Sequence, residues 1–87
     1  MTSPAISDAI LEDGLAQPKV RRAFSARLDM CLKRARLTTL QVARYVGVSS
    51  DEVALWRAGI TVPGRQAYRR LSELLRVDAA WLCIGAT

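Results

Sequence analysis

A glycine between two short amphipathic stretches constrains this chain more than any other feature. Residues 38–59 read TTLQVARYVGVSSDEVALWRAG, and Gly47 divides them into two segments with helical periodicity. Each segment opens on the S/T-x-x-E/Q pattern of a capping box, at Thr38 and at Ser49. Glycine readily takes the φ > 0 conformation that a tight turn between helices needs. The pattern predicts helices over 39–46 and 50–58, the second closed by Gly59.

The apolar positions of these two segments predict how the helices pack. Leu40, Ala43 and Val46 fall on one side of the first helix, and the small Ala43 lets a second helix cross closely. Val53 and Trp56 lie at i and i+3 of the second helix and should face inward, so Trp56 is expected in the core. Two short helices joined in this way form a helix-turn-helix.

The flanking sequence predicts further helices and no strand. An apolar stripe over residues 18–36 indicates a first helix, at Val20, Phe24, Leu28, Cys31, Leu32 and Ala35. A later helix over 65–75 should face the core with Ala67, Leu71, Leu74 and Leu75. Asp78 is placed to cap a short last helix that carries Trp81 and Leu82. The predicted fold class is all-α, with one five-helix domain over residues 18–87.

The order of these pieces resembles the lambda-repressor-like helix-turn-helix domain of phage repressors, Cro proteins and their bacterial relatives. The matching pieces run from about Phe24 to Gly85: LTTLQVARYVGVS, VALWRAG, Pro63, LSELLRVD and WLCIG. The resemblance implies a compact DNA-binding domain that acts as a homodimer on double-stranded operator DNA, with two recognition helices about one DNA turn, ~34 Å, apart. Because the sequence stops at Thr87, we expect no separate oligomerisation domain.

The first 17 residues differ in charge from the rest of the chain. They contain Asp8, Glu12 and Asp13 and no basic residue. Pro4 can start a short helix with Ile6, Ile10 and Leu11 on one side, and Gly14 is expected to end it. The sequence leaves open whether this acidic segment folds back on the domain, serves as a dimer arm or stays unattached.

The net charge of +5 is unevenly distributed. Basic residues crowd the stretch 19–44, where Asp29 is the only acid, and a second group follows later: Lys19, Arg21, Arg22, Arg27, Lys33, Arg34, Arg36 and Arg44, then Arg65, Arg69, Arg70 and Arg76. Such a field favours a polyanion or an anionic membrane surface. An arginine-rich face that only keeps the protein in solution explains the same pattern.

The resemblance places the base-reading residues on the helix predicted over 50–58. They are Ser50, Asp51, Ala54 and Leu55. A serine hydroxyl can donate to or accept from any base, an aspartate can accept from the cytosine amino group, and Ala54 or Leu55 can pack on a thymine methyl. The acids have a second interpretation, because Asp51 and Glu52 in a first turn also complement the helix dipole, and Glu52 can complete the capping box.

The resemblance also implies which residues contact phosphates and the partner subunit. The phosphate set is Thr39, Ser49, Arg57, Arg65 and Arg44, although a solvated face is the better explanation of Arg44 and Arg36. The dimer interface is expected at Trp81, Leu82 and Ile84. Alternatively, Trp81 only closes the core.

Several functional classes lack their residues here. The sequence has no histidine, no cysteine cluster and no paired-carboxylate arrangement, so we expect no enzyme, metal site or cofactor. Cys31 and Cys83 lie in apolar helical patterns and are interpreted as small buried hydrophobes in a reducing cytoplasm. No apolar run reaches the ~20 residues of a membrane span, and no signal pattern opens the chain, which predicts a cytoplasmic protein.

Two functions remain in contention. The first is a sequence-specific DNA-binding regulator, a small repressor that blocks its operator by occupancy. The second is a protein-interaction module, antitoxin-like or anti-repressor, that keeps the fold without reading DNA and docks through Leu55 and the C-terminal apolar residues. Asp51 and Glu52 favour the second, because acids facing phosphates weaken binding to DNA.

Overall fold

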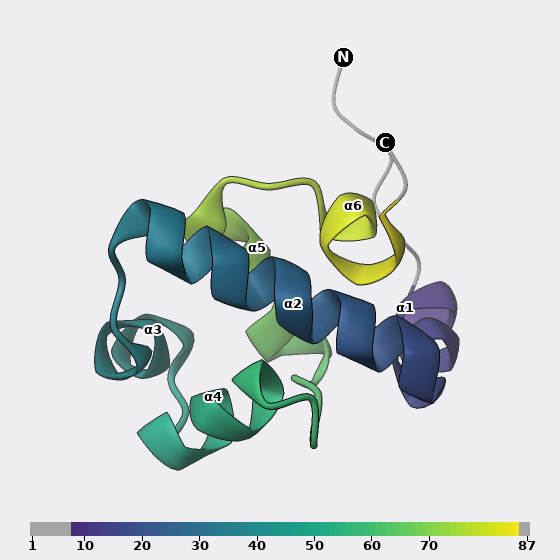
Figure 1. Cartoon of the computed structure of the whole chain (residues 1–87), viewed down its shortest axis with the longest axis horizontal. Helices are drawn as coiled ribbons and strands as arrows, with labels where there is room; N and C mark the ends of the chain where they lie inside the picture. Colours follow the sequence, from purple (N-terminus) through teal and green to yellow (C-terminus); the bar gives the residue numbers. More distant parts are fainter. Residues whose placement is uncertain (1–7, 86–87) are drawn as a thin grey trace.

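The longest helix, α2 (Pro18–Ala35), forms one side of the molecule, and four other helices pack on it (Figure 1). The computed structural model describes residues 8–85. Pro18 lies in the first turn of α2, where its missing N–H costs no hydrogen bond. Phe24, Leu28 and Leu32 recur every four residues along α2 and are completely buried, which confirms the predicted stripe.

The stripe is narrower than predicted at its edges. Val20 and Cys31 are only partly buried, and Ala35 is exposed in the last turn of α2. The helix ends at Arg36, which adopts the left-handed conformation at φ 57° and donates its backbone N–H back to the last turn.

Helices α3 (Thr39–Val46) and α4 (Ser50–Arg57) are joined by the tight turn predicted at Gly47, and together they form what we call the α3–α4 unit. Gly47 has φ 87°, so it adopts the left-handed conformation that its position requires. At Thr38 the capping box is complete, with the Thr38 hydroxyl accepting from Gln41 N–H at 3.1 Å and Gln41 Oε1 accepting from Thr38 N–H at 2.8 Å.

The inward face of α3 differs from the prediction. Val42, Ala43 and Val46 are buried, whereas Leu40 is 50% exposed, so the inward assignment of Leu40 was wrong. Leu40 and Val42 flank Ala43 and Val46 on opposite sides of the helix, so the sequence pattern admits either one as the third inward residue, and contact with the neighbouring helices selects Val42. Val53 and Trp56 of α4 are buried as predicted.

Helices α5 (Arg65–Leu75) and α6 (Ala79–Ile84) complete the core. Tyr68 of α5 is completely buried, lies 5.9 Å from Phe24 between ring centroids, and donates its hydroxyl to the carbonyl of Ala79. Tyr68 was not among the residues predicted to face the core. Asp78 caps α6 as predicted, with Oδ1 accepting from Ala80 N–H at 2.8 Å.

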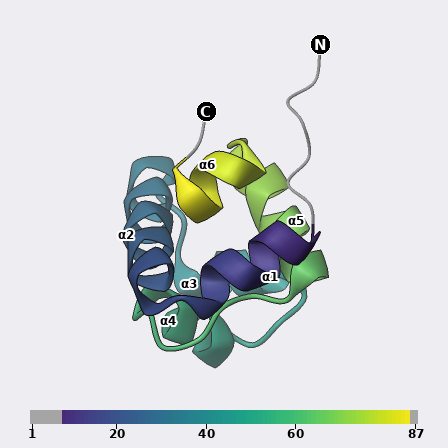
Figure 2. The same cartoon turned by 90° about the vertical axis from the view of Figure 1, so that its right-hand side faces the viewer.

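An additional helix, α1 (Asp8–Ala16), packs on α2 and α6, at the end of α2 opposite α3 (Figures 1 and 2). Its Leu11 and Leu15 are buried, so this part of the acidic segment folds back on the domain. Gly14 was expected to end this helix, but it lies inside α1. A Cβ at Gly14 would lie 3.4 Å from Cys83 Sγ, and the missing side chain lets α1 approach α6 closely. Pro4 and Ile6 lie outside the described residues.

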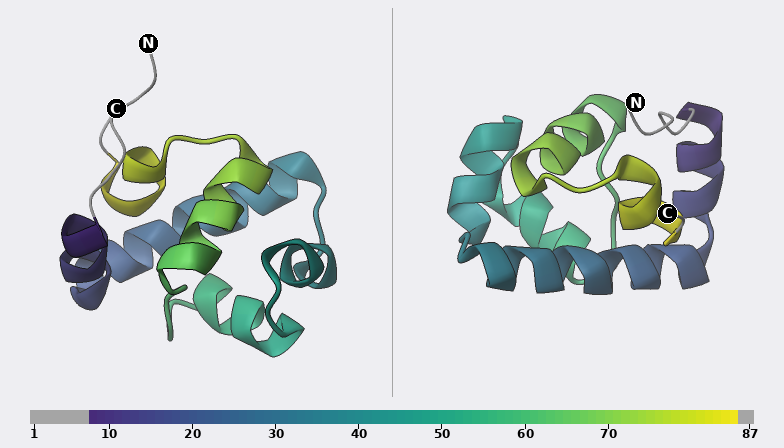
Figure 3. Two further views of the ribbon diagram at one scale, coloured as in Figure 1. Left: turned by 180° about the vertical axis from the view of Figure 1, so that it is seen from behind. Right: turned by 90° about the horizontal axis from the view of Figure 1, so that it is seen from above.

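The structure is therefore all-helical over the described residues, with α1 in the acidic segment and α2 to α6 in the rest of the chain. Within residues 8–85, none of these helices combines the length and apolar character that crossing a membrane requires. The view from behind shows that α4 lies at one edge of the molecule (Figure 3, left).

Replacing Gly47 tests the turn on which the α3–α4 unit depends. We expect Gly47→Ala to lower the free energy of unfolding by about 1 kcal/mol, because an alanine at φ 87° is strained. Space is not the cause, since the nearest atom to an added Cβ is Arg70 Nη1 at 3.7 Å. Urea denaturation measures the change.

The matched control is Gly64→Ser. Gly64 has φ −69°, and an added Cβ meets nothing within 4 Å. A serine at this N-cap of α5 should leave stability unchanged or raise it. Equal stability of Gly47→Ala and the wild-type protein would contradict the assignment of strain.

Candidate nucleic-acid interface

Helix α4 has one face in the core and one face on the surface. Val53 and Trp56 anchor the inner face, and the helix packs on α3 and α2 (Figure 1). The outer face carries the four predicted base-reading residues. All of them are exposed: Ser50, Asp51, Ala54 and Leu55, the last at 37%. A rigidly held helix with a continuous exposed face can enter the major groove of B-DNA, which is wide enough for one helix.

The N-terminus of α3 lies beside the C-terminal end of α4. Arg57 Nη1 donates to Thr39 Oγ1 at 3.0 Å. Because the Thr39 hydroxyl accepts this bond, its own proton is available for donation to another acceptor. Thr39 also belongs to the first turn of α3, whose unpaired N–H groups favour anions. Thr39 and the start of α3 thus form a hydrogen-bond donor group beside α4.

The Arg57 guanidinium is engaged inside the fold rather than free on the surface. Its Nε donates to Asp29 Oδ1 at 3.0 Å, and Lys33 Nζ lies 2.7 Å from the other carboxylate oxygen, Oδ2. Hydrogen bonds from Lys33 and Arg57 lower the pKa of Asp29 below its ordinary value of 3.8. Asp29 therefore stays ionised and holds Arg57 against Thr39.

Three polar side chains on one face of α2 hold the end of α4. Arg21 Nε donates to the carbonyl of Gly59 at 3.0 Å, and Ser25 Oγ donates to the carbonyl of Arg57 at 2.6 Å. With Asp29 these residues recur every four positions, which places them on one face of α2. Ser25 thereby binds a carbonyl of the last turn of α4, which a helix leaves without an intrahelical partner, and Arg21 binds the chain just beyond the helix. Asp29 binds the side chain of Arg57.

The other predicted phosphate residues occupy different environments. Ser49 caps α4, its hydroxyl accepting from Glu52 N–H at 3.1 Å. In the described part of the chain the Glu52 side chain accepts no hydrogen bond from the Ser49 backbone N–H. The capping box predicted there is therefore half formed. Arg44 is exposed in the last turn of α3. Arg65 opens α5 and forms an ion pair with Glu12.

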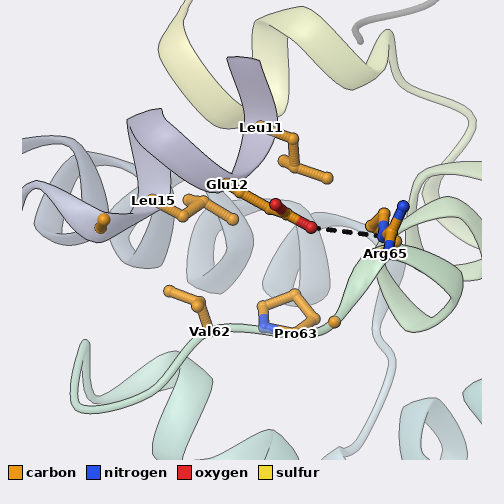
Figure 4. Close-up of a pocket in the computed structure, with 8 residues that line it drawn as sticks. Leu11, Glu12, Leu15, Val62, Pro63 and Arg65 are labelled. Atoms are coloured by element: carbon orange, nitrogen blue, oxygen red, sulfur yellow. Dashed lines mark ion pairs between the residues drawn. The ribbon is translucent and has the colours of Figure 1, made fainter. Parts of the chain in front are cut away.

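A cavity of about 310 Å³ lies between α1 and the segment that leads into α5 (Figure 4). Leu11 and Leu15 of α1 form one wall, and Val62 and Pro63 form the other. The Glu12–Arg65 ion pair spans it, with Arg65 Nε 3.3 Å from Glu12 Oε1. The cavity separates α1 from the loop that follows α4.

The three predicted dimer residues differ in accessibility. Leu82 is completely buried in the core of its own chain, so it presents no surface to a partner and this assignment needs correction. Trp81 is partly buried, and Ile84 is 44% exposed. Of these three residues, Trp81 and Ile84 are accessible to a second subunit.

The cysteine and carboxylate side chains of the described residues do not cluster into a metal site. Within residues 8–85 no group of three or more cysteine or acidic side chains is arranged to hold a metal ion. Cys83 is buried and Cys31 half-buried, both as free thiols, and burial raises the pKa of each. Burial therefore disfavours the thiolate, the more reactive form, at both positions.

Sequence reasoning missed the link between Asp29, Arg57 and Thr39. A signal was present, since Asp29 is the only acid among the eight basic residues of the stretch 19–44. A lone acid among so many basic residues has several possible cationic partners, and only the packing of α2 against α4 selects Arg57.

Comparison with known proteins gives no identification: no family model, curated protein or solved structure matches the chain significantly.

The ionised state of Asp29 predicts how stability depends on acid. Because the pKa of Asp29 is lowered in the folded protein, its contribution is complete above the unfolded value of 3.8 and disappears as pH falls through the folded value. Asp29→Asn should therefore lower the melting temperature at neutral pH and reduce its loss on acidification.

Thermal denaturation followed by circular dichroism between about pH 2 and pH 7 measures this change. Asp13→Asn, at an exposed position of α1, is the matched control and should leave the acid profile close to that of the wild-type protein. A profile for Asp29→Asn parallel to that of the wild-type protein would contradict the assigned role of the carboxylate.

Proposed function

We propose that this chain is a sequence-specific DNA-binding transcriptional regulator, a small repressor that binds a palindromic operator in double-stranded DNA as a homodimer. The observation that carries the proposal is the state of α4, which exposes one complete face at an edge of the molecule while α2 and α3 fix its inner face and its end. Rigid support of this kind is what a recognition helix needs to keep its register against base edges.

In this proposal the exposed face of α4 enters the major groove. Ser50 donates to or accepts from a base edge, and Asp51 accepts from a cytosine amino group. Ala54 and Leu55 pack on thymine methyl groups. None of these side chains makes the bidentate contacts of arginine or glutamine, so part of the sequence preference comes from DNA shape.

Phosphate contacts orient the domain on the duplex. Thr39 donates its hydroxyl proton, and the free N–H groups at the start of α3 add to it. Arg44 supplies an exposed positive charge on the same helix. Arg57 acts indirectly, because it holds the Thr39 hydroxyl in place, and Ser49 contributes as the cap of α4.

The homodimer places two α4 helices in successive major grooves, ~34 Å apart. Trp81 and Ile84 are the surface residues of α6 available for the contact between subunits. Occupancy of the operator then blocks access of RNA polymerase, which is how so small a protein can repress without an enzymatic activity.

Salt dependence and a hydroxyl substitution test the DNA interface. We expect the wild-type protein to bind the DNA upstream of its own gene, with affinity that falls steeply as salt rises. Thr39→Val removes the donor with little change of shape and should weaken binding by about tenfold or more, the effect of one hydrogen bond to a charged group. Fluorescence anisotropy measures both effects.

Thr61→Val is the matched control, since Thr61 is exposed in the loop after α4, and it should bind as the wild-type protein does. This pair of variants is preferable to Arg57→Ala, which would also release Asp29 and the end of α4. Binding that does not change with salt, or equal binding by Thr39→Val and the wild-type protein, would rule out the proposed contacts.

The dimer contact is tested at Ile84. Placing a charge in an apolar contact opposes association, so Ile84→Lys should raise the dimer dissociation constant at least tenfold, about 1.4 kcal/mol. Sedimentation equilibrium gives the constant. Ile60→Lys changes a more exposed isoleucine, 63% accessible, in the loop after α4 and should leave the constant unchanged. A monomeric wild-type protein at all concentrations would refute the homodimer.

A protein-interaction module is the second candidate, and the apolar surface of the α3–α4 unit favours it. Leu40 and Tyr45 are each about half exposed on α3, and Leu55 is exposed on α4 beside the acids Asp51 and Glu52. Such a surface suits a protein partner with apolar and basic residues. Failure of the wild-type protein to bind any duplex at low salt would favour this function over DNA binding.

A further inference from the structure

Helix α1 presents an acid to the first residue of α5. Leu11 and Leu15, one helical turn apart, are buried and fix α1 on the domain. Glu12 follows Leu11 directly and extends across the cavity toward Arg65 (Figure 4). Its Oε1 lies 3.3 Å from Arg65 Nε. The position of the carboxylate is therefore set by the docking of α1 and not by a long flexible loop.

Both partners of this ion pair remain accessible. The side chains of Arg65 and Glu12 are 59% and 61% exposed. An exposed pair of this kind has a weak coupling that water and salt screen, so another anion can displace the carboxylate. Because α1 holds Glu12 next to Arg65 permanently, however, the carboxylate competes at a high effective concentration.

We propose that Glu12 is an affinity-limiting residue of the DNA-binding surface: it competes with the DNA backbone for the Arg65 guanidinium. This inference rests on the proposed function, and it adds to that function the phosphate contact that the family resemblance implies for Arg65 at the start of α5. A phosphate must replace the carboxylate at Arg65 before it gains the contact. The acidic helix α1 thereby weakens attachment to DNA without touching α4.

Asp13 separates this specific competition from the effect of charge alone. It is exposed on the same helix, carries the same charge as Glu12 and forms no ion pair among the described residues. Glu12→Gln and Asp13→Asn therefore change the net charge equally. Only the first removes the negative charge that lies beside Arg65.

The test is a double-mutant cycle on DNA binding. Glu12→Gln, Asp13→Asn, Arg65→Gln and the double variant Glu12→Gln/Arg65→Gln are titrated with a mixed-sequence duplex by fluorescence anisotropy, at several salt concentrations. We expect Glu12→Gln to bind about threefold to fivefold more tightly than Asp13→Asn, the range of an exposed ion pair. Its salt dependence should steepen by up to about 0.9 in slope, equivalent to one phosphate contact.

In the Arg65→Gln background the substitution of Glu12 should bring no more gain than Asp13→Asn brings. Equal affinity of Glu12→Gln and Asp13→Asn, or a gain from Glu12→Gln that persists without Arg65, would overturn the role of Glu12 while leaving DNA binding intact. A wild-type protein that binds no DNA would overturn the proposed function and this inference together. Thermal denaturation of each variant checks that the exposed substitutions keep the fold.

Discussion

The carboxylate of Asp29 links three helices through one chain of polar contacts. It extends from α2, binds the Arg57 side chain at the end of α4, and through Arg57 reaches the Thr39 hydroxyl at the start of α3. Neither ion is fully desolvated, with a third of the Asp29 side chain and a quarter of the Arg57 side chain accessible. The pair thus avoids the high cost of deep burial, while its geometry fixes the angle at which α4 leaves the body of the molecule.

The positive charge of the chain serves two different purposes. The net value of +5 suggests a surface for polyanions, yet several cations are occupied within the fold. Arg21 binds the carbonyl of Gly59, Arg27 binds the carbonyl of Cys83, and Arg57 binds Asp29. These arginines place the helices, and exposed residues such as Arg44 keep their charge toward solvent. Counting basic residues therefore overstates the charge that a nucleic acid can contact.

Local chemistry was sufficient to predict much of the fold. A left-handed glycine, two N-caps and the buried tryptophan of α4 each follow from a few neighbouring residues, and Gly47, Thr38, Asp78 and Trp56 lie as predicted. Features that depend on distant contacts could not be obtained in this way. Gly14 has the local character of a helix terminator, but close packing of α1 on α6 keeps it inside the helix.

In the candidate site, too, local sequence predicts some features, and others depend on contacts between distant residues. Exposure of Ser50, Asp51, Ala54 and Leu55 follows from the period of α4, whose opposite side carries the core residues. The partners of Arg57 and Arg65 do not follow from any local pattern. Asp29 is 28 residues from Arg57 and Glu12 is 53 positions before Arg65, so each pair exists only after the helices pack.

Because α1 packs closely on α6, movement of α1 away from α6 can be detected at Cys83. The sulfur of Cys83 is covered where Gly14 offers no side chain, and its raised pKa keeps it protonated. Any excursion that lifts α1 from α6 uncovers this sulfur. Cys31, half-buried on α2, stays accessible throughout and supplies an internal reference. The chain therefore contains its own chemical reporter of local opening, readable from the ratio of two alkylation rates.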